Sequence, residues 1–218
     1  MKILAVEFSS EQRSVAVVQS RSGSSPLLLG QAVENGRHRA LGLVEEALRQ
    51  AHCEREEIET LAVGLGPGSY TGIRGAIALA QGWQLGRGIN LIGISSVECL
   101  AAGAEQEKIL GSLYVIVDAQ RREFYLAPYE LAPGSCLEKE ALRLASWAEI
   151  ETLAQRGERL IGPNASQWFP SAKSLFPDAA ILGRLAASRS DFVAGEAMQP
   201  IYLRETAFKK APPTRTTI

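Results

Sequence analysis

The sequence has 218 residues, a formal net charge of −1, 46% hydrophobic residues and 22% charged residues. These values are ordinary for a globular protein, and the length is sufficient to bury a sizeable core. A protein that binds nucleic acid by itself usually carries a basic excess or a basic stripe, and neither is visible here. Any role in RNA chemistry is therefore expected to depend on a partner.

Cysteine usage and hydropathy indicate the compartment. The three cysteines form no CxxC pair, and an odd number gives no disulfide framework, which fits a reducing cytosol. The first residues, MKILAVEFSS, lack the apolar stretch and the cleavage site of a signal peptide, and no apolar run is long enough to span a membrane. We expect a cytoplasmic protein that makes no contact with a membrane.

Three short strands are predicted at the start of the chain. Apolar runs at residues 3–6, 14–18 and 27–33 are separated by polar segments, and RSGSSP between the second and the third run is a typical turn. Strands joined by such short turns are expected to pair as an antiparallel meander.

Helices and strands then alternate. The apolar spacing predicts a helix over 37–52, a strand over 60–65, a helix over 70–85, a strand over 91–94 and a helix ending near 104. The order of the first half is therefore strand, strand, strand, helix, strand, helix, strand, helix. This order is typical of a ribonuclease-H-like or actin-like core, which is an α/β layer fold.

The second half begins like the first. The apolar run 113–117 is followed by Asp118 and a polar turn, and then by an apolar run at 124–129, so that strand, acid, turn and strand recur. We interpret this recurrence as an internal repeat. The prediction is a duplicated actin-like fold with a reduced second domain. The predicted parts are an N-terminal domain over 1–107, a smaller C-terminal domain over 108–208 and a disordered tail over 209–218.

Four polar residues form a candidate nucleotide site. Glu7 and Asp118 each follow an apolar strand, where α/β sheets place ligands, and Ser9 and Ser10 lie in the polar turn after the first strand. Acids at strand ends are also common as solvated groups with no function. Glutamate at position 7 weakens the functional interpretation, because the side chain is longer than the aspartate that is usual in that fold.

A glycine-rich segment, GPGSYTGIR, lies at 66–74 between a buried strand and a helix. Free N–H groups at the start of a helix can hold an anion, but the segment does not match the GxxxxGK[ST] pattern of a phosphate loop. The alternative is a rigid turn in which Ser69 or Thr71 caps the helix.

The helix after this turn carries glycines at a helical spacing. Glycine in a helix interior costs about 1 kcal/mol relative to alanine, so several on one face indicate close approach by another element. The helix over 37–52 has two adjacent apolar stripes. Together the two helices suggest a partner interface, although both could instead cover only their own sheet. The candidate interface residues are His38, Leu41, Val44, Glu45, Leu48, Thr71, Gly72, Arg74, Gly75, Leu79 and Gly82.

Catalytic and metal-binding patterns are missing from the sequence. The two histidines, His38 and His52, form no HxxxH or HExxH pair, so a zinc or iron site is not expected. No histidine lies in a context that suggests a Ser-His-Asp hydrolase. We therefore assign no catalytic residue and no metal ligand.

With GPGSYTGIR, the chain resembles the TsaB (YeaZ) family of bacterial actin-like proteins. Supporting stretches, in the family's order, are ILAVEFSSEQRSVAVV, RHRALGLVEEAL, LIGISSVECLA, VDAQRREFYLAPY and PIYLR. They extend from residue 3 to about residue 204. Most relatives have DTS or DTA where this chain has Glu7-Phe8-Ser9, which puts independent nucleotide binding in further doubt.

The resemblance implies a role in forming threonylcarbamoyladenosine on tRNA, beside the anticodon. In that family the catalyst is a larger paralogue, TsaD, and TsaB is a non-catalytic subunit that binds it through its first two helices. The implied partners are a TsaD-like protein, a TsaE-like ATPase and, for the chain alone, a second copy. ATP, a metal ion and tRNA are expected only through the complex.

Three other functions are alternatives to this one. An independent actin-like ATPase or small-molecule phosphotransferase needs two full domains, and the irregular second half is too small for one of them. A glycoprotease needs a metal or a nucleophile constellation. A ribonuclease-H-like nuclease needs three or four carboxylates around magnesium, and only Glu7 and Asp118 are suitably placed.

Overall fold

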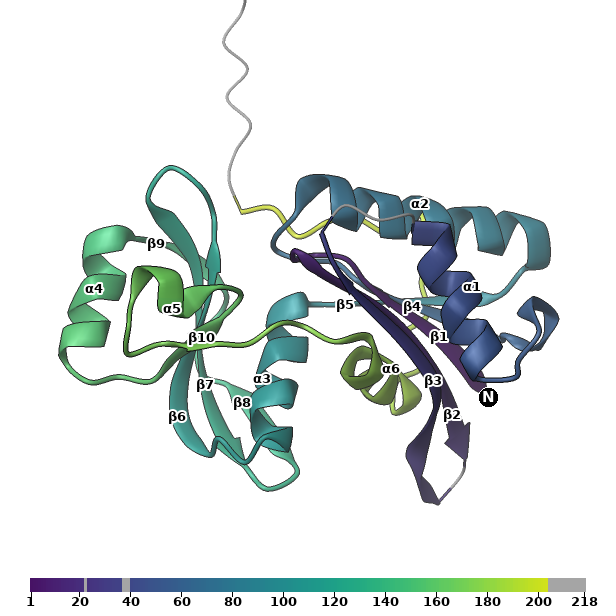
Figure 1. The fold of residues 1–218 in the computed structure, drawn as a ribbon, viewed down its shortest axis with the longest axis horizontal. Helices are drawn as coiled ribbons and strands as arrows, with labels where there is room; N and C mark the ends of the chain where they lie inside the picture. The colour runs from purple at the N-terminus through teal and green to yellow at the C-terminus, as the bar shows by residue number, and fades with distance from the viewer. Residues whose placement is uncertain (22, 37–39, 204–218) are drawn as a thin grey trace, which may run out of the picture.

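The computed structural model describes residues 1–21, 23–36 and 40–203 (Figure 1). Two β-sheets lie side by side, with the helices α3 (Ser96–Gln106) and α6 (Ala179–Ala187) in the region between them. His38 and the predicted tail over 209–218 lie outside the described residues.

The first sheet contains five strands in the order β3-β2-β1-β4-β5. β1, β2 and β3 pair antiparallel, and β4 and β5 continue the sheet parallel to β1. The predicted meander and the parallel strands that follow it are confirmed. The strand bounds are β1 Lys2–Glu7, β2 Gln12–Arg21, β3 Ser24–Asn35, β4 Thr60–Gly64 and β5 Asn90–Ile94.

Helices cover both faces of the first sheet. α1 (Ala40–Gln50) and α2 (Tyr70–Arg87) share one face, where their apolar side chains join those of β1, β2 and β4 in one core. α6 packs on the other face, against β1 and β2. Side chains from both helix layers therefore bury the central strands, which explains why β1 and β4 are apolar at nearly every position.

The second sheet repeats the pattern of the first. Its order is β11-β10-β6-β7-β8, and β9 pairs with β7. β6, β7 and β8 pair antiparallel, and β10 and β11 continue parallel to β6. The bounds are β6 Gly111–Asp118, β7 Glu123–Ala132, β8 Ser135–Glu138, β9 Arg143–Ser146, β10 Leu160–Gly162 and β11 Lys173–Ser174. Read from β8 to β11, the second sheet has the same strand order and the same strand directions as the first sheet read from β3 to β5, which confirms the predicted duplication.

The second unit is smaller in its parallel part. β10 and β11 have three and two residues, whereas β4 and β5 have five each. Two short helices, α4 (Trp147–Gln155) and α5 (Ala165–Trp168), lie on this sheet's outer side, and the short 3-10 helices are Arg55–Glu57 and Gly195–Ala197. The predicted reduction of the second domain thus corresponds to shortened parallel strands.

The chain returns to the first sheet at its C-terminal end. After α6, the backbone N–H of Val193 donates to Leu91 O at 2.9 Å, and that of Ile201 donates to Leu65 O at 2.9 Å. The predicted division at residues 107 and 108 stays a prediction. It did not anticipate that α6 and the segment 193–201 pack on the first sheet. Within the described ranges, no helix has both the length and the apolar character needed to cross a bilayer.

Candidate functional site

A cleft of about 390 Å³ is lined by turns from both halves of the chain. Ser9 and Ser10 reach it from the turn after β1, and Asp118 reaches it from the end of β6. Tyr70 and Trp168 add aromatic walls. The duplicated fold thus brings together three of the four residues that the sequence marked as a nucleotide site.

Glu7, the fourth residue, does not reach this cleft, and its predicted place there is wrong. Its side chain is fully buried, with Oε1 accepting from Ser9 N at 2.7 Å and Oε2 accepting from Ser96 Oγ at 2.8 Å. A Cβ atom at Gly64 would lie 1.9 Å from Oε2, so the carboxylate packs directly against β4. Glu7 therefore joins β1 to the start of α3 rather than facing a ligand.

Burial raises the pKa of the Glu7 carboxyl above its ordinary value, and hydrogen bonds from Ser9 and Ser96 oppose this effect. Between the unfolded pKa and the raised folded pKa, the folded chain binds more protons than the unfolded chain. The stability associated with Glu7 is therefore complete below the unfolded pKa and is lost as the pH rises through the folded pKa.

Replacing Glu7 by glutamine should remove this titration. We expect the stability of Glu7→Gln, relative to the unsubstituted chain, to increase between an acidic pH below 4.5, the ordinary carboxyl value, and an alkaline pH above the raised pKa of Glu7. Glutamine keeps the shape but accepts only one of the two hydrogen bonds, which costs the same free energy at every pH. Urea unfolding of both chains at the two pH values measures the difference, and a pH-independent difference would contradict the assignment.

The glycine-rich segment 65–69 and the start of α2 pack closely against the turn after β1. A Cβ atom at Gly68 would lie 2.1 Å from Ser9 O, and one at Gly72 would lie 2.0 Å from Phe8 O. Gly66 and Gly68 have φ values of 84° and 148°, which L-residues rarely adopt. Ser69 provides the predicted cap, since its Oγ accepts from Gly72 N at 3.3 Å. Close backbone approach therefore requires glycine at positions 68 and 72, and the φ value favours it at position 66.

Several polar groups of the cleft already have hydrogen-bond partners in the chain. Ser9 N donates to Glu7, and both the backbone N–H and the side-chain amide of Gln120 donate to Asp118, at 2.8 and 2.7 Å. Glu11 and Asp118 are acidic, and the described residues that line the cleft include no lysine or arginine. A phosphate group that arrives without a cation would therefore meet carboxylates of the same sign.

A face of α2 presents small residues to solvent. A Cβ atom built at Gly75, Gly82 or Gly86 would meet no atom of another element within 4 Å. Thr71 and Arg74 are exposed on the same helix, and Leu79 is half-buried. In the described structure, therefore, no element makes the close approach to which the glycines of this face are suited.

Three other predicted interface residues are part of the chain's own core, and these assignments are wrong. Val44 is 2% exposed and Leu48 is 5% exposed, because both pack from α1 onto the first sheet. Gly72 is buried against the backbone of Phe8. Leu41 and Glu45 do face solvent, and Glu45 forms an ion pair with Arg55 at 3.0 Å.

An aromatic cluster at the start of α2 was missed from the sequence. The Arg74 guanidinium lies 4.8 Å from the centre of the Tyr70 ring, and the Tyr202 ring stacks on Tyr70 with 5.6 Å between centres. Tyr70 also lines the cleft. The cluster therefore links the cleft, the solvent-facing side of α2 and the end of the described chain. No local pattern near PIYLR indicates this contact.

Comparisons with known proteins identify the family of the chain. A family model described as "TsaD: tRNA N6-adenosine threonylcarbamoyltransferase" matches residues 22–209. The chain belongs to this family. Within it, the resemblance to TsaB (YeaZ) proteins is confirmed by matches to curated proteins that carry the TsaB name.

Two curated relatives and one solved structure illustrate the similarity. A "tRNA threonylcarbamoyladenosine biosynthesis protein TsaB" of Escherichia coli K12 is 27% identical, covering 97% of this chain and 99% of the relative. The protein of the same name from Bacillus subtilis is 26% identical over 76% of this chain and 72% of the relative. The structure of YeaZ from Pseudomonas aeruginosa superimposes with a TM-score of 0.75 at 24% identity, covering 93% and 99% of the two chains. The fold is thus that of YeaZ.

Proposed function

We propose that the chain is a non-catalytic subunit that supports a TsaD-like catalytic protein in forming threonylcarbamoyladenosine on tRNA, next to the anticodon. The proposal rests on one structural observation, the solvent-facing glycines of α2, together with the names of the curated relatives. We place this function in the cytoplasm.

The solvent-facing glycines of α2 lower the stability of the helix, and a partner that packs on them would offset this loss. Each glycine in an exposed helix interior destabilises the helix by about 1 kcal/mol relative to alanine. Within the described structure nothing lies near a Cβ at Gly75 or Gly82. A helix from a partner could approach this backbone closely, and side chains larger than hydrogen would prevent that approach. Exposed apolar side chains on the same two helices, Leu41 of α1 and Leu85 of α2, are 61% and 90% exposed.

The acidic cleft supports the view that other subunits of the complex bind ATP and the metal ion. The donors of Gln120 are already bonded to Asp118, and the described residues that line the cleft offer no lysine or arginine to a phosphate, so we leave ATP and any metal ion to other proteins. We assign those groups to the TsaD-like protein and a TsaE-like ATPase, and we expect tRNA to bind only to the assembled complex. Alone, the chain is expected to use the same α2 face to form a homodimer.

Reconstitution tests the proposal. The chain should co-purify with the TsaD-like protein of its host, and modification of tRNA by the purified components should depend on adding it. If the chain neither binds that protein nor changes the yield of modified tRNA, the proposal is wrong.

The alternative is an independent actin-like ATPase or small-molecule phosphotransferase. It is favoured by the convergence of Ser9, Ser10 and Asp118 in one cleft between two duplicated sheets. Magnesium-dependent ATP hydrolysis by the pure chain distinguishes the two functions, because a non-catalytic subunit should show none above background.

A further inference from the structure

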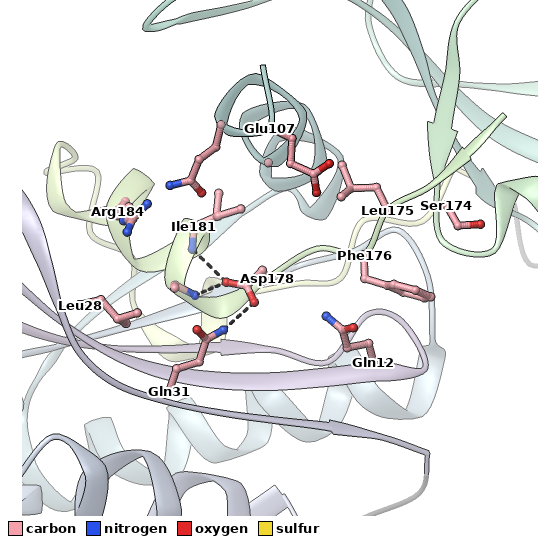
Figure 2. Close-up of a pocket in the computed structure, with 13 residues that line it drawn as sticks. Gln12, Leu28, Gln31, Glu107, Ser174, Leu175, Phe176, Asp178, Ile181 and Arg184 are labelled. Carbon is pink, nitrogen blue, oxygen red and sulfur yellow. Dashed lines mark hydrogen bonds between the residues drawn. The ribbon is translucent and has the colours of Figure 1, made fainter. Parts of the chain in front are cut away.

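A second cavity, of about 430 Å³, shares no lining residue with the cleft (Figure 2). Its walls come from β2, β3, α3, α6 and the segment between β11 and α6. Both halves of the chain therefore contribute to it. The volume is within the range of cavities that hold small organic ligands.

The carboxylates of this cavity already have partners. Asp178 caps α6, accepting from Ala180 N at 2.8 Å, and its other oxygen accepts from Gln31 Nε2 at 2.6 Å. Glu107 forms an ion pair with Lys173. Figure 2 shows Asp178 and Gln31 joined in the middle of the cavity. Glu107 is thus paired with a cation, whereas Asp178 has only neutral donors and keeps its negative charge, so an anionic ligand has to place its charge at the Arg184 end of the cavity.

The guanidinium of Arg184, unlike these carboxylates, has no partner among the described residues. Its half-buried side chain lines the cavity, and it forms no ion pair or hydrogen bond with any described residue. The amide ends of Gln12 and Gln106 likewise have no hydrogen bond to described side chains or backbone. A guanidinium offers a fork of donors that matches a carboxylate, and the glutamines can both donate and accept.

Apolar side chains line the rest of the cavity. Leu175 and Phe176 lie on the side away from Arg184, and Leu28 and Ile181 are nearer to it (Figure 2). Gly103 adds no side chain, and a Cβ atom there would lie 3.1 Å from Ile181 Cδ1. The cavity thus has a cationic end, hydrogen-bonding amides and an apolar end.

We propose that this cavity binds a small organic carboxylate with an amide group and an apolar body, the chemistry of an N-acyl amino acid. Arg184 pairs with the carboxylate, the glutamine amides bond to the ligand's amide, and Leu175 and Phe176 cover its apolar part. Because both halves of the chain line the cavity, the bound ligand braces one half against the other. This site is separate from the α2 face and does not rest on the proposed function.

Titration of the full chain with N-acetyl-L-leucine tests the proposal, with N-acetyl-L-leucinamide as the uncharged probe of the same shape. The amide signals of Gly103, Ala180 and Ile181 in two-dimensional NMR report on the cavity. We expect saturable shifts with a Kd of about 1 mM for the acid and at least about tenfold weaker binding of the amide.

Arg184→Gln should abolish the preference for the acid, whereas Arg49→Gln should leave it unchanged. Arg49 is exposed on α1, pairs with Glu46 and does not line the cavity, so its loss changes the net charge equally. Circular dichroism confirms that both variants fold. Equal binding of acid and amide, unchanged preference in Arg184→Gln, or no shift at these signals up to the solubility limit would each overturn the proposal.

Discussion

Replacing Gly75 by tryptophan should abolish binding to a TsaD-like partner while the chain stays folded. A side chain at this position meets no atom of another element within 4 Å of its Cβ, so the indole extends into solvent. A partner that packs closely on α2 would collide with it. We expect affinity to fall by at least about a hundredfold, which corresponds to about 2.7 kcal/mol. Pull-down and calorimetric titration with the purified partner measure the loss.

The matched control is Ala148→Trp, which places the same indole on an exposed position of α4 in the second half. It should bind the partner as the unsubstituted chain does. Neither variant should unfold at a clearly lower urea midpoint, and Gly75→Trp should unfold at an equal or somewhat higher one because glycine is the poorer helix former. If Gly75→Trp folds normally and still binds normally, α2 is not the partner surface and the proposed function loses its structural support.

Replacing Gly72 by alanine, on the same helix, should instead lower the free energy of unfolding of the chain. The added Cβ would lie 2.0 Å from the carbonyl oxygen of Phe8. Phe8 is 1% exposed in the core and cannot move without disturbing the first sheet. We expect a cost of about 3 kcal/mol, at the upper end of what overpacking usually produces. Urea unfolding measures it.

Gly86→Ala provides the comparison, because it makes the same chemical change on α2 where nothing lies nearby. Removing glycine there should leave stability equal or raise it by up to about 1 kcal/mol. Equal stability of the Gly72→Ala chain and the unsubstituted chain would show that the close contact between α2 and the turn after β1 does not exist in solution.

The strands and helices of the first half were predictable because their signals are local. β1 and β4 are short apolar runs bounded by polar residues, and α1 has the apolar spacing of a helix. Periodicity identifies an apolar face but not what covers it. For this reason Val44 and Leu48 were assigned to a partner, although they cover their own sheet.

The site was only partly predictable for a related reason. Strand order and duplication bring Ser9, Ser10 and Asp118 to one cleft, and both are readable from the sequence. The direction of the Glu7 side chain depends on Ser96, which is 89 residues away. Contacts at such separation leave no trace in the local pattern.

The place of α6 sets the order in which the protein can be completed. One face of the first sheet, with Ile3, Ala5 and Ala62, is covered by Leu182 and Ala186 of this helix. Synthesis from the ribosome proceeds from the N-terminus, so those strands emerge long before their cover does. The nascent first sheet keeps an apolar face open until the whole second sheet has been made. During that interval the growing chain presents the kind of surface that chaperones bind.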